Sequence, residues 1–61
     1  MNVLQILIVD DQQVVRRGVR DLIRAHPGWE VCGEAVNGLD ALEKAAAFEP
    51  DIVVMDISMR S

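Results

Sequence analysis

A chain of 61 residues is long enough for one small domain or for part of one. Its ten acidic residues outnumber its six basic ones, giving a net charge of −4, which argues against nucleic-acid binding by this segment. Cys32 is the single cysteine, so no disulfide can form within the chain. No apolar run has the length of a membrane span or the form of a signal peptide, and we therefore expect a reducing, cytoplasmic location.

The first predicted element is a strand from Val3 to Val9 that runs directly into two aspartates, Asp10 and Asp11. The unbroken apolar run "ILIV" is typical of a strand buried on both faces, as in parallel sheets. A helix is predicted from Gln12 to about Ala25, and Asp11 is expected to cap its first amide groups. Helical spacing predicts the following inner face: Val15, Val19, Leu22 and Ile23.

A second strand is predicted over Glu30–Ala35, weakened by a glycine within it. Strand alternation places Cys32 on the same side as Glu30 and Glu34, where we interpret it as a small packing residue and not a reactive thiol. The dipeptide "NG" predicts a turn, with Asn37 also suited to cap the helix that follows.

The second helix is predicted over Gly38–Phe48, with an Asp40–Lys44 pair on its outer side. Its inner face is expected to carry Leu39, Leu42 and Ala46. A third strand, Ile52–Met55, is again apolar, and Asp56 ends it.

The resulting order of elements, β-α-β-α-β, predicts an α/β fold with a parallel sheet. If the strand order is 2-1-3, the two helices cover opposite faces and a crevice opens where strands one and three end. Asp10, Asp11 and Asp56 would then meet at that crevice. The order 1-2-3 would place a strand between them, and the sequence leaves both orders open.

Three neighbouring carboxylates repel one another unless a proton or a cation compensates their charge. A set of oxygen donors suits Mg²⁺, which takes one or two carboxylates and completes its shell with water and phosphate oxygens. An aspartate can also accept a phosphoryl group covalently. These residues therefore predict a site for phosphoryl transfer.

The stretches "ILIVDDQQVVRRGVRDLI", "VCGEAVNGLDALEKA" and "PDIVVMDISM" resemble the receiver domain of two-component response regulators. They look closest to the subgroup with a C-terminal helix-turn-helix DNA-binding domain, and the resemblance covers residues 4–59. It implies a flavodoxin-like (CheY-like) fold with a three-stranded parallel sheet of order 2-1-3. Residues 1–61 would form a truncated receiver domain, containing the first three strands and two helices of the family.

The resemblance also implies roles for individual residues. Asp56 matches the aspartate that a sensor histidine kinase phosphorylates, and the protein would be a signalling switch and not an enzyme. Mg²⁺ would be bound by Asp11 directly, by Asp10 largely through water, by Asp56, and by the backbone carbonyl of Ser58. The family's hydroxyl residue after strand four and lysine after strand five are not among these residues, and Lys44 cannot replace that lysine because it lies on the second helix.

Two other functions are compatible with the same residues. A half-receiver could assemble as a homodimer without phosphotransfer, because its third strand would lie at an edge of the sheet. A phosphatase of the haloacid dehalogenase type also uses an aspartate after a strand, but it requires Asp-x-Asp, and Gln12 stands at the second position.

A basic face on the first helix is a further candidate for function. Arg16, Arg20 and Arg24 are spaced at i, i+4 and i+8. Such a face is either simply solvated or, following the resemblance, a docking surface for the kinase.

Overall fold

The computed structural model describes residues 3–55. In chain order its elements are β1 (Leu4–Val9), α1 (Gln13–Arg24), β2 (Trp29–Ala35), α2 (Gly38–Phe48) and β3 (Ile52–Met55). No boundary differs from the predicted one by more than a single residue. Asp56 and Ser58, two of the residues predicted to form the site, lie outside the described residues.

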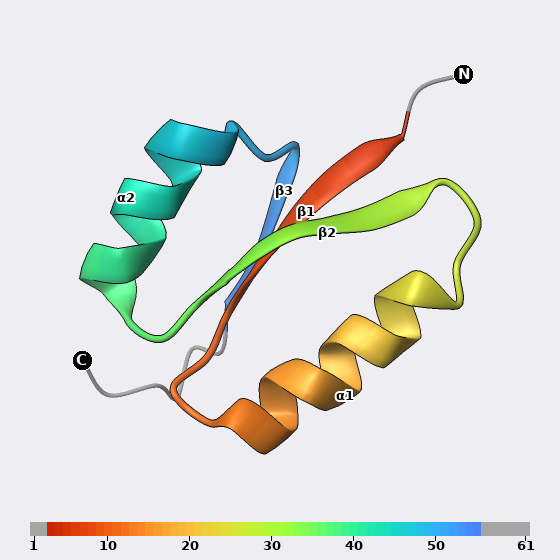
Figure 1. Cartoon of the computed structure of the whole chain (residues 1–61), viewed down its shortest axis with the longest axis horizontal. Helices are drawn as coiled ribbons and strands as arrows, with labels where there is room; N and C mark the ends of the chain where they lie inside the picture. The colour runs from red at the N-terminus through yellow and green to blue at the C-terminus, as the bar shows by residue number, and fades with distance from the viewer. Residues whose placement is uncertain (1–2, 56–61) are drawn as a thin grey trace.

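The three strands form a parallel sheet in the order β2-β1-β3, which confirms the 2-1-3 arrangement and excludes 1-2-3. Figure 1 shows α1 and α2 on opposite sides of this sheet. In the register of the sheet, Val9 lies opposite Ala35 on one side and opposite Met55 on the other. The carboxyl ends of β1 and β3 are therefore neighbours, as the predicted crevice requires.

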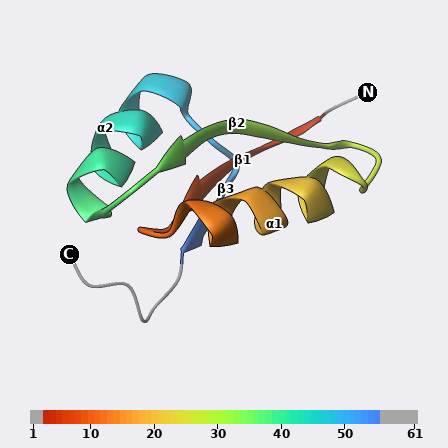
Figure 2. The same cartoon turned by 60° about the horizontal axis from the view of Figure 1, so that its bottom comes forward.

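The middle strand supplies most of the core, and its side chains alternate between the two helices. Leu7 and Val9 are buried in a cluster under α2, whereas Ile6 and Ile8 are buried in a cluster under α1. Figure 2, turned toward one edge, shows β1 between the two helical layers. Burying one such side chain contributes about 1.5–3 kcal/mol, so β1 is the main stabilising element.

A bulge interrupts β2 and changes which side chains face which helix. Ile6 pairs with Val31 and Leu7 with Gly33, so Cys32 has no partner of its own in the register. Cys32 consequently packs in the cluster under α2, while Glu34 lies on the α1 side. The expected grouping of Cys32 with Glu34 is therefore wrong, because strand alternation does not continue through a bulge.

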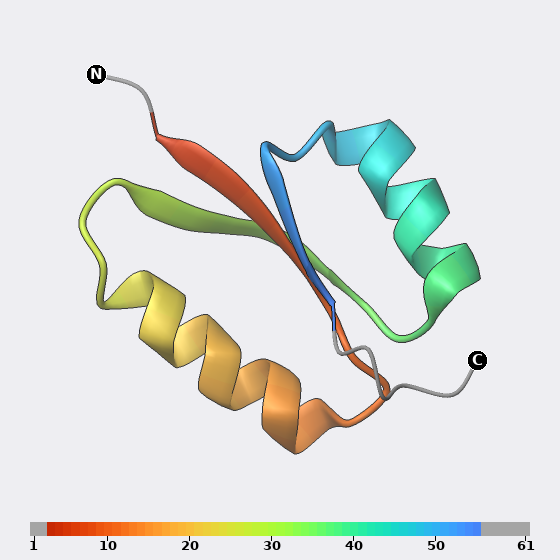
Figure 3. The ribbon, with the colours of Figure 1, turned by 180° about the vertical axis from the view of Figure 1, so that it is seen from behind.

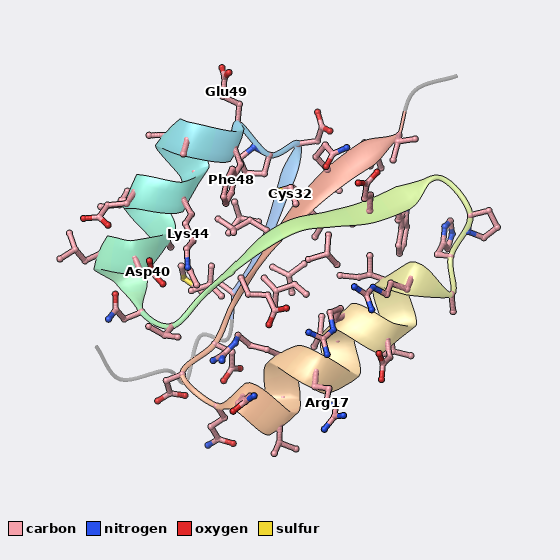
Figure 4. All side chains as sticks on the ribbon, in the orientation of Figure 1. Arg17, Cys32, Asp40, Lys44, Phe48 and Glu49 are labelled. Carbon is pink, nitrogen blue, oxygen red and sulfur yellow. The ribbon has the colours of Figure 1, made fainter. Side chains whose placement is uncertain are left out.

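The inner face of α2 differs from the predicted one. Leu39 and Leu42 are 69% and 71% exposed, whereas Ala41 is buried. Ala45 packs beside Ala41 against the sheet, and the Phe48 ring reaches Gly33 of β2 (Figure 4). Small side chains allow the helix to lie close to the strands, so the leucines are not needed in this layer.

The inner face of α1 is also rotated relative to the prediction. Leu22 is 74% exposed, while Ile23 is buried and Val19 packs partly against it. The helix turns two arginines, Arg16 and Arg20, toward β2, where they contact Glu34. The inner stripe therefore follows helical spacing, but half of it is charged.

One of the two edges of the sheet is formed by β3, and the other by β2. All four of its residues are exposed apolar side chains, from 39% at Val54 to 47% at Met55. Figure 3 shows β3 beside β1 as seen from behind. Within residues 3–55 no further strand pairs with this edge.

Candidate functional site

Asp10 is held at the end of β1 by its backbone and by its side chain. Its N–H donates to the carbonyl oxygen of Ala35 (3.0 Å), which continues the pairing of β1 with β2. Its Oδ1 accepts from the N–H of Gln12 (2.9 Å), which turns the chain toward α1. At 3% exposure, Asp10 is the one buried charged residue in the part of the chain that the structure describes.

Asp11 is exposed and does not cap α1. The N-cap residue is Gln12, and no side-chain cap bond is made there. The expectation of a cap at Asp11 is therefore wrong, because the turn is closed by Asp10 instead. This leaves the Asp11 carboxylate directed to solvent and available to a ligand.

Arg16 connects Asp10 to the neighbouring strand. Its Nη1 donates to the carbonyl oxygen of Asp10 (2.7 Å), and its Nε donates to Oε1 of Glu34 (3.3 Å). The other carboxylate oxygen of Glu34 accepts from Nη1 of Arg20 (3.0 Å). Only 14% of the Arg16 side chain and 30% of the Arg20 side chain are exposed.

These contacts correct the interpretation of the basic face as simply solvated, whereas kinase docking stays a prediction. Arg16 and Arg20 are engaged by Glu34, and Arg16 also by the Asp10 carbonyl, so they do not form a simply solvated face. Arg24 is exposed at the end of α1, and Arg17 points away from the sheet in Figure 4. The free positive charge of this helix is therefore on its outer side.

The β2–α2 connection is held by a second polar group. Asn37 caps α2 by accepting from the Asp40 N–H (2.8 Å), as predicted. The predicted Asp40–Lys44 pair also forms (3.1 Å), and Figure 4 shows the two side chains together at the start of α2. Lys44 additionally donates to the carbonyl oxygen of Glu34 (2.6 Å). The Val36 N–H bond to Asp40, followed by the Lys44 bond, holds the pKa of the Asp40 carboxyl below its usual value.

Sequence reasoning did not identify Glu34 as part of this region. It accepts from two arginines through its side chain and from Lys44 through its carbonyl. The available signal was a lone glutamate late in a strand, with two arginines four residues apart in the preceding helix. The bulge concealed it, because simple alternation assigns Glu34 to the other face.

The third predicted carboxylate is not described by the structure, but its neighbours are. Asp56 follows Met55 in the sequence, and Met55 lies opposite Val9, the residue before Asp10. Among residues 3–55 no three metal-ligating side chains gather in one place. Asp10 and Asp11 offer carboxylate oxygens at the end of β1, and this donor chemistry fits a hard cation such as Mg²⁺.

An apolar hollow lies beside Asp10 between α1 and β3. It is lined on the helix by Val15 and Val19 and on the strand by Val54 and Met55. No helix among residues 3–55 has the length and apolar character needed to span a membrane.

Comparison with known proteins identifies relatives of this chain in sequence and in fold. A family model described as "Response regulator receiver domain" matches residues 6–61. The protein-glutamate methylesterase/protein-glutamine glutaminase of Geobacillus kaustophilus is 44% identical over 59 residues, which are 97% of this chain and 17% of that protein. The protein of the same name from a Nocardioides species is 52% identical over 56 residues, which are 92% of this chain and 15% of that protein.

Two solved structures also superimpose well. The response regulator domain of Thermotoga maritima CheB has a TM-score of 0.91 and 40% identity, covering 98% of this chain and 45% of that chain. A LuxR-family two-component response regulator from an Aurantimonas species has a TM-score of 0.91 and 38% identity, and the match covers 98% of this chain and 43% of that chain. The chain thus spans less than half of these solved chains and about a sixth of the methylesterases.

Proposed function

Because the chain belongs to the response regulator receiver domain family, we propose that it accepts a phosphoryl group from a sensor histidine kinase on Asp56. The supporting observation is the strand order β2-β1-β3, which makes the ends of β1 and β3 neighbours. An aspartate follows each of these strand ends in the sequence. In the proposed step a carboxylate oxygen of Asp56 forms a bond to phosphorus as the bond between phosphorus and the donor breaks.

We propose that Mg²⁺ is bound by the carboxylates of Asp10, Asp11 and Asp56 together with the backbone carbonyl of Ser58. When bound, the ion would neutralise charge on the transferring group. Asp10 contributes a fixed anchor, since its Oδ1 is already held by the Gln12 N–H. Asp11 contributes an exposed carboxylate next to that anchor.

Titration with Mg²⁺ tests the site directly. We expect weak binding that is lost in Asp11→Asn and weakened in Asp56→Asn. Asp21→Asn, which removes an equal charge from the exposed side of α1, is the matched control and should bind like the wild type. Equal affinity in the wild type and Asp11→Asn would refute the assignment.

Intact mass after incubation with an acyl phosphate and Mg²⁺ tests the phosphoryl acceptor. We expect slow labelling confined to Asp56 and absent in Asp56→Asn. The rate should be far below that of a receiver containing the distal hydroxyl and lysine, because one missing stabilising donor can cost about 10²–10³ in rate. Rapid stoichiometric labelling, or labelling that persists in Asp56→Asn, would contradict this proposal.

A second candidate function is assembly without phosphotransfer. The observation that favours it is the β3 edge, where four apolar side chains are exposed within the described structure. An unpaired apolar edge is a template for strand pairing, and two copies joined antiparallel would give the order 2-1-3-3′-1′-2′. Sedimentation equilibrium should then detect a dimer that Val53→Lys dissociates. A folded monomer at micromolar concentration would rule this function out.

The output of the whole protein is a separate proposal. The sequence resemblance supports a cytoplasmic transcription regulator with a helix-turn-helix domain, whereas the curated relatives described above are named as methylesterases. The coding sequence downstream of residue 61 distinguishes the two. A methylesterase domain there would overturn the transcription-regulator proposal.

A further inference from the structure

We propose that Arg16 is a positioning residue for the acidic pair, oriented by Glu34 and acting through the carbonyl of Asp10. The inference rests on the metal site of the proposed function but adds a residue outside its ligand set. Arg16 binds the Asp10 carbonyl with Nη1 and Glu34 with Nε, so one guanidinium joins the end of β1 to β2. A planar guanidinium making two bonds has little freedom to rotate.

The contacts of Asp10 explain why this bond matters. The peptide that joins Asp10 to Asp11 carries the carbonyl that Arg16 holds, so its orientation sets the direction in which the main chain continues from Asp10 to Asp11 and Gln12. The Asp10 N–H is held by Ala35 and its Oδ1 by Gln12. Arg16 supplies the remaining restraint, on the carbonyl side of the residue.

Glu34 orients the arginine. Its two carboxylate oxygens accept from Arg16 and from Arg20, and its own position is fixed by the strand and by the Lys44 bond to its carbonyl. Arg20 shares the glutamate but has no contact with Asp10 among the hydrogen bonds of residues 3–55. The pair Arg16 and Arg20 therefore separates a role in positioning from a role in stability.

The sign of the expected effect separates positioning from simple electrostatics. Arg16 is a positive charge close to a site for a cation, so removing it relieves repulsion and, by Coulomb's law alone, raises Mg²⁺ affinity. Loss of an orienting contact acts in the opposite direction. Groups that orient metal ligands typically cost about tenfold or more in metal affinity when they are removed.

The experiment compares Arg16→Met, Arg16→Lys and Arg20→Met in the full 61-residue chain by Mg²⁺ titration. We expect Arg16→Met to weaken Mg²⁺ binding about tenfold. Arg16→Lys should recover part of the loss, because an ammonium can still donate to the Asp10 carbonyl. Arg20→Met should leave the affinity within about twofold while lowering the urea midpoint, since it loses only the bond to Glu34.

A metal-free measurement accompanies the titration. Hydrogen exchange of the Gln12 amide reports whether Asp10 Oδ1 still holds it, and it should become faster in Arg16→Met but not in Arg20→Met. This readout remains informative if the chain binds no Mg²⁺, so failure of the metal site and failure of the positioning role are distinguishable. If Arg16→Met does not fold, Arg16→Lys against Arg20→Met makes the same comparison. Unchanged Gln12 exchange, or a rise in Mg²⁺ affinity, in the Arg16 variants would overturn the proposal.

Discussion

The two faces of the sheet are held to their helices by different means. Under α2 the contacts are made by small residues, Ala35, Ala41 and Ala45, and by the Phe48 ring against Gly33. Under α1 the aliphatic cluster is accompanied by arginines that bind Glu34. The α2 face depends mainly on close approach and the α1 face on charge, and the side chain that bonds the Asp10 carbonyl comes from α1.

The difference follows from the residues that the sequence places on each helix. The inner stripe of α2 lets the helix approach because alanines occupy it. The inner stripe of α1 contains long arginine side chains, whose stems can cover apolar surface while the charged ends reach a partner. The charged layer can transmit a change in the position of α1 directly to Asp10 through Arg16, whereas Lys44 of α2 bonds the carbonyl of Glu34 and makes no hydrogen bond to Asp10 among residues 3–55.

Substitution at Gly33 should have the largest effect on stability, because an added side chain would disturb the close packing of α2 on the sheet. A Cβ there would lie 2.6 Å from Cε2 of Phe48, so Gly33→Val must displace the ring. We expect a loss of about 2–3 kcal/mol in the free energy of unfolding, as for overpacked cores. Urea denaturation measures it, and the cost should shrink in a Phe48→Ala background. Gly18→Ala is the control, since outside its chain neighbours and the backbone of its own helix nothing lies within 4 Å of a Cβ there. An equal loss in that variant would contradict the steric explanation.

Glu34→Gln removes the negative charge that pairs with Arg16 and Arg20 on the α1 side of the sheet. The neutral amide cannot accept from both arginines, and we expect about 1–2 kcal/mol of destabilisation. The loss should be smaller at high salt, because partly exposed ion pairs are screened. Urea midpoints at low and high salt check this, with the exposed Glu43→Gln as a matched control. A loss independent of salt would show that the ion pairs are not responsible.

Helix capping sharpens the comparison further. Asn37 accepts a hydrogen bond from the Asp40 N–H, whereas Gln12 caps α1 without a side-chain bond. Asn37→Ala should therefore cost about 1 kcal/mol and Gln12→Ala much less. Thermal unfolding of the two variants provides the measurement. Equal shifts in the melting temperature would mean that the cap bond at α2 contributes nothing.

The smallest expected effect is the pH dependence that Asp40 contributes on the α2 side. The bonds from Val36 and Lys44 lower its pKa in the folded chain from the usual 3.8. The stabilisation is therefore present above pH 3.8 and is lost as the pH falls through the folded-state pKa. The urea midpoints of the wild type and Asp40→Asn should converge at acid pH. A difference that stays constant down to the lowest pH would refute the assignment.

Much of the fold could be predicted from the sequence because its signals are local. Apolar runs, the Asn37-Gly38 turn and helical spacing located the elements to within a residue. The orientation of each helix about its axis was harder to predict, as Leu22 and Leu42 show. Hydrophobicity favours leucine inside, but the arginine–glutamate contacts and the close approach of alanines decide the rotation. These depend on residues from different elements, which spacing within one helix cannot reveal.

The candidate site was predicted only in part. The sequence correctly placed Asp10 and Asp11 at the end of β1, next to the end of β3. It did not predict that Asp10 closes the turn in place of Asp11, or that Arg16 reaches its carbonyl. The roles of Asp56 and Ser58 remain predictions, because they lie outside the described residues.

The bulge in β2 has a consequence for how sequences of this kind can be compared. Side chains along a strand alternate between the two faces of the sheet, and Cys32 is one extra residue within β2. Residues after Cys32 therefore face the side opposite to the one that simple alternation from Val31 predicts. Val31 and Glu34, an odd number of positions apart, share a side because of it. Deleting Cys32 would leave Val31 and Glu34 two positions apart, so uninterrupted alternation would keep them on the same side of the sheet. A one-residue gap at this point in an alignment would therefore mark the loss of the bulge, and not a change in which helix Val31 and Glu34 face.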